Sequence, residues 1–572
     1  KLTVVMVAFL IPAGASAAEQ WRIHQSYDGD CAGIFDTKKY TYFLGYMQKY
    51  DPLVPGADVP YISVYRYDKE GDELIPLNSQ TYLSGNVASA VDYNYDKGYL
   101  LVAYSDGNID MLYEDGRLVN LPGLMLSSSD LKKNINSITF YPEENKVFLA
   151  TDFGYVTIDD KKGEISSSRN FSEKVLSVAK HKTRLFVATL NGLFEGPETA
   201  LSLDKFYKVN GITEPRKMVT VGTNLMYISY GQEGDLRVAR YEPQDVNLFF
   251  PQPVVDLPVN SFGKVNGKIM AGFSDRIYIT DPYGTDRTIM LEEPDFKSPV
   301  GTFDFTEFWF SHGRVGFQRK KVPAGDRGTW TVLSNEFRPN ASTAFMCPSM
   351  AYHPWYGMLV RNHGFDNFWT VQWIPDLLSG YKNMRWTPLS STYREDGNTF
   401  YTVMPKGIAI NPNNQNQVFC GSFISGILRL DLKDIENSLH MSRPSEEGFG
   451  KPGFVQIVPE PVAPNNRYQT SFGDPVFDAG GNLWIGYADG DLNNVKGKGS
   501  LQAWLWTKED IFESKDAATF RPFRKFEYSG VKSNGGIRVL PLKHSSSRNL
   551  VLLNSGVNDG TIRILNHAGT FD

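Results

Sequence analysis

Residues Leu100–Leu112, LLVAYSDGNIDML, contain two β-strands joined by a tight turn. The first five residues place apolar side chains on both faces of the strand, as expected for a strand that is covered on both sides. After the turn, Ile109 and Met111 lie on one face of a second strand. The pair Asp106-Gly107 favours a hairpin, because glycine adopts positive φ at little cost and aspartate tolerates the turn. The stretch therefore predicts a β-hairpin inside a packed sheet.

The same cassette recurs along the chain. It appears as VFLATDFGYVTID (147–159), RLFVATLNGLFEG (184–196), QVFCGSFISGILRLD (417–431) and LWIGYADGDL (483–492). The turn glycines Gly107, Gly154 and Gly192 lie 47 and 38 residues apart, and short apolar strands precede the cassettes. Repeats of ~40–50 residues with several strands each are typical of β-propeller blades.

The number of cassettes predicts an all-β protein with two tandem β-propellers of four-stranded antiparallel blades. About ten blades are expected, whereas one propeller closes with about four to eight. We place the first propeller at residues 18–325 and the second at residues 326–572 of the 572-residue chain. The last residues, LNHAGTFD, directly follow a strand, which leaves open whether the second propeller is complete.

Residues 1–17 resemble the end of a secretory signal peptide, with a positive start, an apolar run and the small residues Ala15-Ser16-Ala17. The apolar run is shorter than the ~20 residues that a membrane-spanning helix needs. This pattern predicts an exported protein.

Composition narrows the possible partners and chemistry. The net charge is −6 and lysine and arginine are scattered, so no basic surface for nucleic acid is expected. Only Cys31, Cys347 and Cys420 occur, an odd number that does not resemble a disulfide framework. Cys420 lies inside an apolar strand and is expected to be a buried small hydrophobic residue.

Two stretches carry a family resemblance. They are EQWRIHQSYDGDCAGIFDTKKYTYFLGY (19–46) and the segment that contains YSDGNIDML, INSITF and LATDFGYVTID. Both resemble the N-terminal propeller of the PorZ family, accessory proteins of the type IX secretion system. The close likeness covers residues 19–170, and the remainder is similar in its propeller architecture, which is related to two-component regulator propellers.

The resemblance implies a surface protein of a Gram-negative bacterium, in the periplasm or at the cell surface and peripheral to the outer membrane. The family has two propellers and a C-terminal sorting domain, and is linked to the delivery of anionic lipopolysaccharide to the sortase of the attachment complex. Anionic lipopolysaccharide and sortase-complex proteins are therefore the implied partners. No C-terminal sorting domain is seen in these residues, which departs from the family pattern.

No pattern of residues indicates catalysis. None of the eight histidines pairs at metal-binding spacing, and no nucleophile elbow or phosphate-binding loop occurs. We therefore expect no catalytic residues, no metal and no cofactor, and a protein that is not an enzyme. Catalytic carboxylates contributed by different blades form no motif in the sequence, so these patterns do not reveal them.

The candidate ligand-binding residues lie in the aromatic segment 352–386. Aromatic faces can stack on sugar or lipid rings, and guanidinium groups bind phosphate or carboxylate. The other reading is that most of these rings pack in a blade core. The candidate residues are Trp355, Arg361, Trp369, Trp373, Arg385 and Trp386.

Three functions fit these patterns. The first is a non-catalytic binding and scaffold protein of the type IX secretion apparatus. The second is a periplasmic propeller that senses a glycan for a two-component system, which predicts a membrane span and a kinase downstream. The third is a polysaccharide-acting enzyme of propeller fold, which requires several carboxylates at one propeller mouth.

Overall fold

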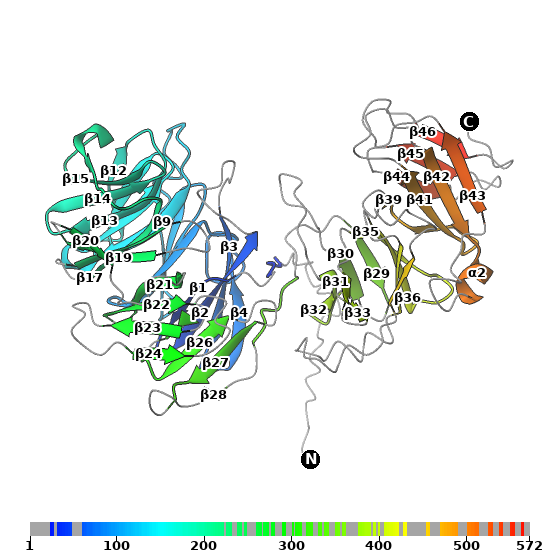
Figure 1. The fold of residues 1–572 in the computed structure, drawn as a ribbon, viewed down its shortest axis with the longest axis horizontal. Coiled ribbons are helices and arrows are strands. Elements are labelled where there is room, and N and C mark those ends of the chain that lie inside the picture. The colour runs from blue at the N-terminus through cyan, green and yellow to red at the C-terminus, as the bar shows by residue number, and fades with distance from the viewer. Residues whose placement is uncertain are drawn as a thin grey trace, which may run out of the picture.

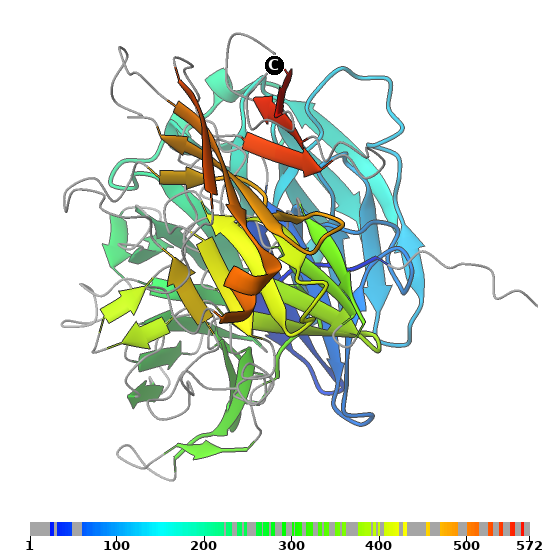
Figure 2. The same ribbon diagram turned by 90° about the vertical axis from the view of Figure 1, so that its right-hand side faces the viewer.

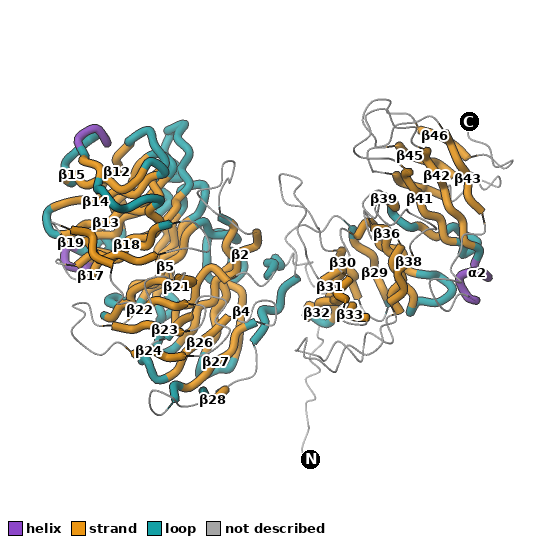
Figure 3. Tube along the Cα trace, in the orientation of Figure 1, coloured by secondary structure: helices purple, strands orange, loops and turns teal. Residues whose placement is uncertain are grey.

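The computed structural model describes residues 23–27, 31–48 and 60–221 without a break, and between 225 and 565 it describes the strands and some of the turns. Strands dominate the described part of the chain (Figure 3). Its helices are η1 (Pro142–Glu144), η2 (Leu203–Lys205) and α2 (Lys508–Glu513). The predicted all-β fold is confirmed, whereas the predicted signal peptide at residues 1–17 lies outside the described residues.

The described residues from Cys31 to Val332 form seven four-stranded sheets, each an antiparallel meander in chain order. We call these sheets blades 1 to 7. Blade 1 contains β1 (Cys31–Asp36), β2 (Tyr40–Gln48), β3 (Tyr61–Asp68) and β4 (Glu73–Leu77), and blade 2 contains β5 (Ala90–Asn94), β6 (Tyr99–Ala103), β7 (Ile109–Tyr113) and β8 (Leu118–Asn120). Blade 3 contains β9 (Ile135–Tyr141), β10 (Lys146–Thr151), β11 (Gly154–Asp159) and β12 (Glu164–Asn170).

The remaining blades of this group follow the same order. Blade 4 contains β13 (Val175–His181), β14 (Arg184–Thr189), β15 (Gly192–Pro197) and β16 (Tyr207–Lys208), and blade 5 contains β17 (Pro215–Val221), β18 (Leu225–Tyr230), β19 (Arg237–Glu242) and β20 (Asp245–Leu248). Blade 6 contains β21 (Val259–Val265), β22 (Lys268–Phe273), β23 (Arg276–Thr280) and β24 (Ile289–Glu292), and blade 7 contains β25 (Val300–Gly301), β26 (Glu307–Ser311), β27 (Phe317–Lys321) and β28 (Thr331–Val332).

The seven blades close into a ring, because β1 contacts both β25 and β26. The backbone N–H of Tyr27 donates to the carbonyl of Ser342 at 2.8 Å, and Ser26 forms a parallel bridge with the same residue. The segment before blade 1 thus pairs with the segment after blade 7. This group is a seven-bladed propeller, drawn blue to green in Figure 1.

The propeller core consists of apolar layers between neighbouring blades. The β6–β7 hairpin of blade 2 shows how these layers form. Every residue of β6 is fully buried. Leu101 and Met111 belong to the layer against blade 3, whereas Leu100 and Leu112 belong to the layer against blade 1. Gly107 has φ +88° in the turn. The predicted hairpin and its two covered faces are confirmed.

The second group of sheets contains β29 (Met350–His353), β30 (Gly357–Arg361), β31 (Asp376–Lys382) and β32 (Arg385–Ser390) in one sheet, followed by the hairpin β33 (Tyr393–Glu395) and β34 (Asn398–Phe400). The next sheets are β35 (Pro405–Ile410), β36 (Gln417–Ser422), β37 (Ile427–Asp431) and β38 (Phe454–Ile457), then β39 (Thr470–Phe472), β40 (Val476–Phe477), β41 (Leu483–Asp489), β42 (Ser500–Trp506) and β43 (Arg524–Ser529), and finally β44 (Ile537–Pro541), β45 (Leu550–Asn554) and β46 (Ile562–Leu565). Figure 2 shows this group in yellow-green to red, facing the viewer.

The predicted boundary between residues 325 and 326 is corrected by the pairing of blade 7. Lys320 pairs with Val332 across β27 and β28, so the first propeller extends past residue 325. The last strand of blade 7, β28, is only two residues long, which is too short for a sequence pattern to place it.

Cys420 on β36 is a fully buried free thiol, as predicted. Burial raises its pKa to about 12, so the thiol stays protonated and unreactive at neutral pH.

Blades 3 and 4 are joined by a charge cluster that predicts a pH-dependent stability. Lys180 on β13 forms ion pairs with Glu144 and, at 2.9 Å, with Glu198, and Lys146 contacts the same two carboxylates. Burial alone raises the pKa of Glu144 and of Glu198, but the hydrogen bonds from Lys146 and Lys180 outweigh it and lower both values.

A carboxyl group whose pKa is lowered by folding stabilises the fold above its unfolded pKa, and the contribution disappears as the pH falls through the folded pKa. We therefore expect Lys180→Met, which keeps the apolar stem, to lower the urea midpoint at pH 7. The difference from the unsubstituted protein should shrink below about pH 4. A difference of the same size at both pH values would contradict the role of the cluster.

Candidate functional site

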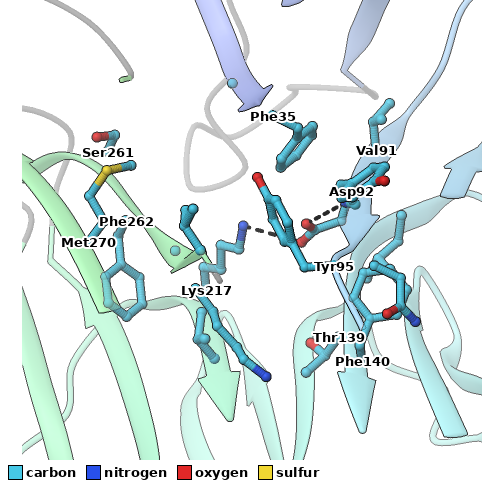
Figure 4. Close-up of a pocket in the computed structure, with 18 of the residues that line it drawn as sticks. Phe35, Val91, Asp92, Tyr95, Thr139, Phe140, Lys217, Ser261, Phe262 and Met270 are labelled. Carbon is cyan, nitrogen blue, oxygen red and sulfur yellow. Dashed lines mark hydrogen bonds and ion pairs between the residues drawn. The ribbon is translucent and has the colours of Figure 1, made fainter. Parts of the chain in front are cut away.

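A cavity of about 330 Å³ lies at the axis of the first propeller, where the innermost strands of the blades meet. Its walls come from β1, β5, β9, β17 and β21, which belong to five different blades. Figure 4 shows apolar rings on several sides of it, among them Phe35, Phe140 and Phe262. The hydroxyl of Thr220 on β17 donates to the carbonyl of Phe140 on β9 at 3.3 Å, which joins two of the walls.

Two ion pairs cross the axis. Asp92 on β5 pairs with Lys217 on β17 at 3.4 Å, and the two side chains point toward each other in Figure 4. Asp96, which follows β5, pairs with Lys264 on β21 at 3.6 Å. Blade 2 lies opposite blades 5 and 6 in a seven-bladed ring, so both pairs connect opposite sides of the propeller.

The ion pairs are accessible to water, because the side chains of Asp92 and Lys217 are 19% and 39% exposed and those of Lys264 and Asp96 are 23% and 50% exposed. Exposed pairs of this kind contribute only about 0–1 kcal/mol to stability. Each pair offers a hydrogen-bond donor and an acceptor side by side. The cavity thus combines apolar rings with two paired charges, as ligand pockets do. Arg216 is the fifth charged residue of the lining, and its Nε–H donates to the carbonyl of Gly231 at 2.7 Å.

Tyr95 stands inside the same cavity, near Phe35 (Figure 4). Burial raises the pKa of its phenol well above the ordinary value. The hydroxyl is therefore neutral at any physiological pH, and the ring face adds a further aromatic wall.

None of these cavity residues was predicted from the sequence. The strands themselves are visible as the short apolar segments that precede the cassettes, such as INSITFYP and RKMVTVG. Which of their residues face the axis depends on ring closure, and closure brings together strands more than 150 residues apart, such as β5 and β21.

Of the predicted ligand-binding residues, Arg385 and Trp386 lie together at the start of β32. Arg385 is exposed and Trp386 is half-buried. The indole N–H of Trp386 donates to His24 Nδ1 at 3.1 Å, and the His24 ring also contacts Tyr381 at 4.6 Å between centroids. Trp386 therefore packs against the segment that precedes blade 1.

The segment that follows blade 7 reaches the same place. The backbone N–H of Trp386 donates to Asn340 Oδ1, and Asn340 Nδ2 donates to the carbonyl of Met384, both at 2.7 Å. Both ends of the first propeller thus contact the β31–β32 hairpin of the second group.

Arg361 lies at the other end of the same sheet. It pairs with Leu378 across β30 and β31, whereas Arg385 pairs with Lys382. Four residues along a strand correspond to about 13 Å, so the structure does not bring Arg361 next to Arg385. Trp355, Trp369 and Trp373 lie outside the described residues, and the predicted site stays a prediction for them.

A scan against protein-family models matches residues 60–206 to the N-terminal β-propeller domain of PorZ of the type IX secretion system. The predicted resemblance to PorZ is confirmed. The matched residues run from β3 of blade 1 to the end of η2 in blade 4.

Two solved structures are similar over nearly the whole chain. One is PorZ, described as an essential bacterial surface component of the type IX secretion system of Porphyromonas gingivalis. Its TM-score is 0.60 and its sequence identity is 16%, and the match covers 96% of this chain and 73% of the PorZ chain. The other is the extracellular domain of a hybrid two-component system of B. thetaiotaomicron, with a TM-score of 0.36, 12% identity and coverage of 95% and 72%. At these identities PorZ supports the fold alone, and the second likeness is too weak to support a conclusion. No protein with a curated description matches the chain.

Among the described residues there is neither a membrane-spanning helix nor a metal-binding cluster. No helix there has the length and apolar character needed to cross a membrane. No group of three or more His, Cys, Asp or Glu side chains in that part of the chain is arranged to hold a metal ion.

Proposed function

We propose that this protein is a non-catalytic binding and scaffold component of a type IX secretion apparatus, exported and associated with the outer membrane. The match of residues 60–206 to the PorZ N-terminal propeller is the observation that carries this proposal. The seven-bladed ring supports it physically, because a rigid disc can present loops from several blades on one binding face.

Anionic lipopolysaccharide and the proteins of the sortase complex are the proposed partners. The chain has a net charge of −6, so general electrostatic attraction cannot bring it to an anionic polymer. Binding therefore requires a local cationic and aromatic surface. Arg385 with Trp386 provides such a surface among the described residues, because Arg385 is exposed and its guanidinium matches phosphate and carboxylate geometry.

The experiment is affinity capture from an outer-membrane extract with the full chain, followed by mass spectrometry of the captured proteins and lipids. We expect sortase-complex proteins and anionic lipopolysaccharide in the eluate, and less lipopolysaccharide with Arg385→Glu. Tyr207→Ala, which removes an exposed ring of blade 4, is the matched control and should capture normally. Capture of neither partner, with binding of soluble glycan fragments instead, would favour the sensor function.

A further inference from the structure

The axial cavity of the first propeller is lined by both aromatic rings and ion pairs. Phe35, Phe140 and Phe262 are among the residues that line it, and two ion pairs from opposite blades belong to the same lining. Both pairs are partly exposed, so their remaining hydrogen-bonding capacity faces solvent rather than buried protein.

We propose that this cavity binds one neutral sugar ring or a cyclic polyol of similar size. Sugar rings have apolar faces that pack on aromatic side chains and hydroxyl groups that both donate and accept hydrogen bonds. An Asp–Lys pair matches a hydroxyl on both counts, since the carboxylate accepts its proton and the ammonium donates to its oxygen.

Each ion pair disfavours a charged ligand at its own position. A carboxylate or phosphate ligand at Lys217 would meet the carboxylate of Asp92 at the same place, and an ammonium ligand would meet Lys217 itself. The pair of Asp96 with Lys264 repeats this arrangement. A neutral polyol is repelled neither by the carboxylates nor by the ammonium groups.

The volume favours a single ring. At about 330 Å³ the cavity lies at the small end of the ~300–1,000 Å³ range of ligand pockets. The ring could be a free monosaccharide or the terminal residue of a glycan chain. The proposal does not rest on the proposed function, because it is argued from the residues of the cavity alone and is tested without any secretion partner.

The test is calorimetric or saturation-transfer NMR titration of the full chain with methyl glucoside, methyl mannoside, methyl galactoside, N-acetylglucosamine and inositol. Glucuronate and glucosamine serve as charged comparisons, and a short oligosaccharide of the best ligand distinguishes a chain end from a free ring. We expect at least one neutral ring to bind, and to bind better than its charged analogue.

Two variants locate the site. The double variant Asp92→Asn, Lys217→Met removes both charges together, and Phe262→Ala removes one stacking face. Each should weaken binding by about tenfold or more, while circular dichroism and the melting midpoint show that the propeller is still folded. Lys162→Met, on the exposed surface of blade 3, is the control and should bind as the unsubstituted chain does.

Three results would overturn the proposal. The first is that no neutral ring binds at millimolar concentration. The second is that glucuronate or glucosamine binds better than the neutral rings. The third is that the folded cavity variants bind with unchanged affinity.

Discussion

Replacing Trp309 by alanine is expected to lower the free energy of unfolding by about 3–5 kcal/mol, the range for removal of a fully buried aromatic side chain. Trp309 on β26 is 1% exposed and lies in the layer that closes blade 7 against blade 1. Its ring contacts Phe43 at 5.1 Å and Tyr67 at 5.5 Å between centroids, both in edge-to-face geometry. The substitution therefore opens a cavity at the seam of the ring, and urea denaturation followed by far-UV circular dichroism measures the loss.

The control for this prediction is Trp309→Phe. The indole N–H of Trp309 is buried with no hydrogen-bond partner in the described part of the chain. Phenylalanine keeps most of the ring contacts and removes that donor, so it should cost much less than alanine. A loss below about 1 kcal/mol for alanine would show that this layer does not hold the ring closed. Equal losses for the two variants would show that the ring contacts kept by phenylalanine do not stabilise the seam.

The second large effect is expected for Asp110→Ala in blade 2. Asp110 is fully buried, and its carboxylate accepts hydrogen bonds from the backbone and hydroxyl of Ser84, from Tyr104 and from Asn120, at 2.7–2.9 Å. Alanine leaves these donors without their acceptor, and a buried unsatisfied donor costs about 1–3 kcal/mol. We expect a total loss of about 2–4 kcal/mol in the free energy of unfolding.

Asp115→Ala is the matched control, because Asp115 lies in an exposed turn of the same blade and accepts one backbone hydrogen bond. It should change the free energy of unfolding by about 1 kcal/mol or less. Asp110→Asn keeps the shape of the side chain and one acceptor oxygen. Its loss in the free energy of unfolding should lie between those of Asp110→Ala and Asp115→Ala. If Asp110→Ala unfolds at the same urea concentration as Asp115→Ala, the Asp110 hydrogen bonds do not stabilise the blade.

The propeller fold could be predicted because its repeating unit is local. An apolar strand, an Asp-Gly turn and an alternating strand are adjacent in the chain, so the hairpin around Gly107 was predicted correctly together with the face shared by Ile109 and Met111. The burial of Asp110 could not be predicted. An aspartate at an alternating position is normally exposed, and here Ser84 and Tyr104, 26 and 6 residues earlier, provide its partners.

The functional sites depend on contacts across the fold, and sequence patterns carry little information about those. The axial cavity unites Asp92 with Lys217 because the ring places blade 2 opposite blade 5. The aromatic and arginine residues of segment 352–386 predicted a ligand-binding site, but the strand register separates Arg361 from Arg385. The contact between His24 and Trp386 joins residues at a separation of 362, which no local pattern reveals.

The proposed function is tested most directly by the affinity of the full chain for anionic lipopolysaccharide, compared with lipopolysaccharide from the same outer membrane that lacks the anionic polysaccharide. Binding to immobilised lipopolysaccharide would be measured at low and high salt. We expect a clear preference for the anionic form that weakens as salt screens the charges. Equal binding to the two forms, or no binding to either, would contradict it.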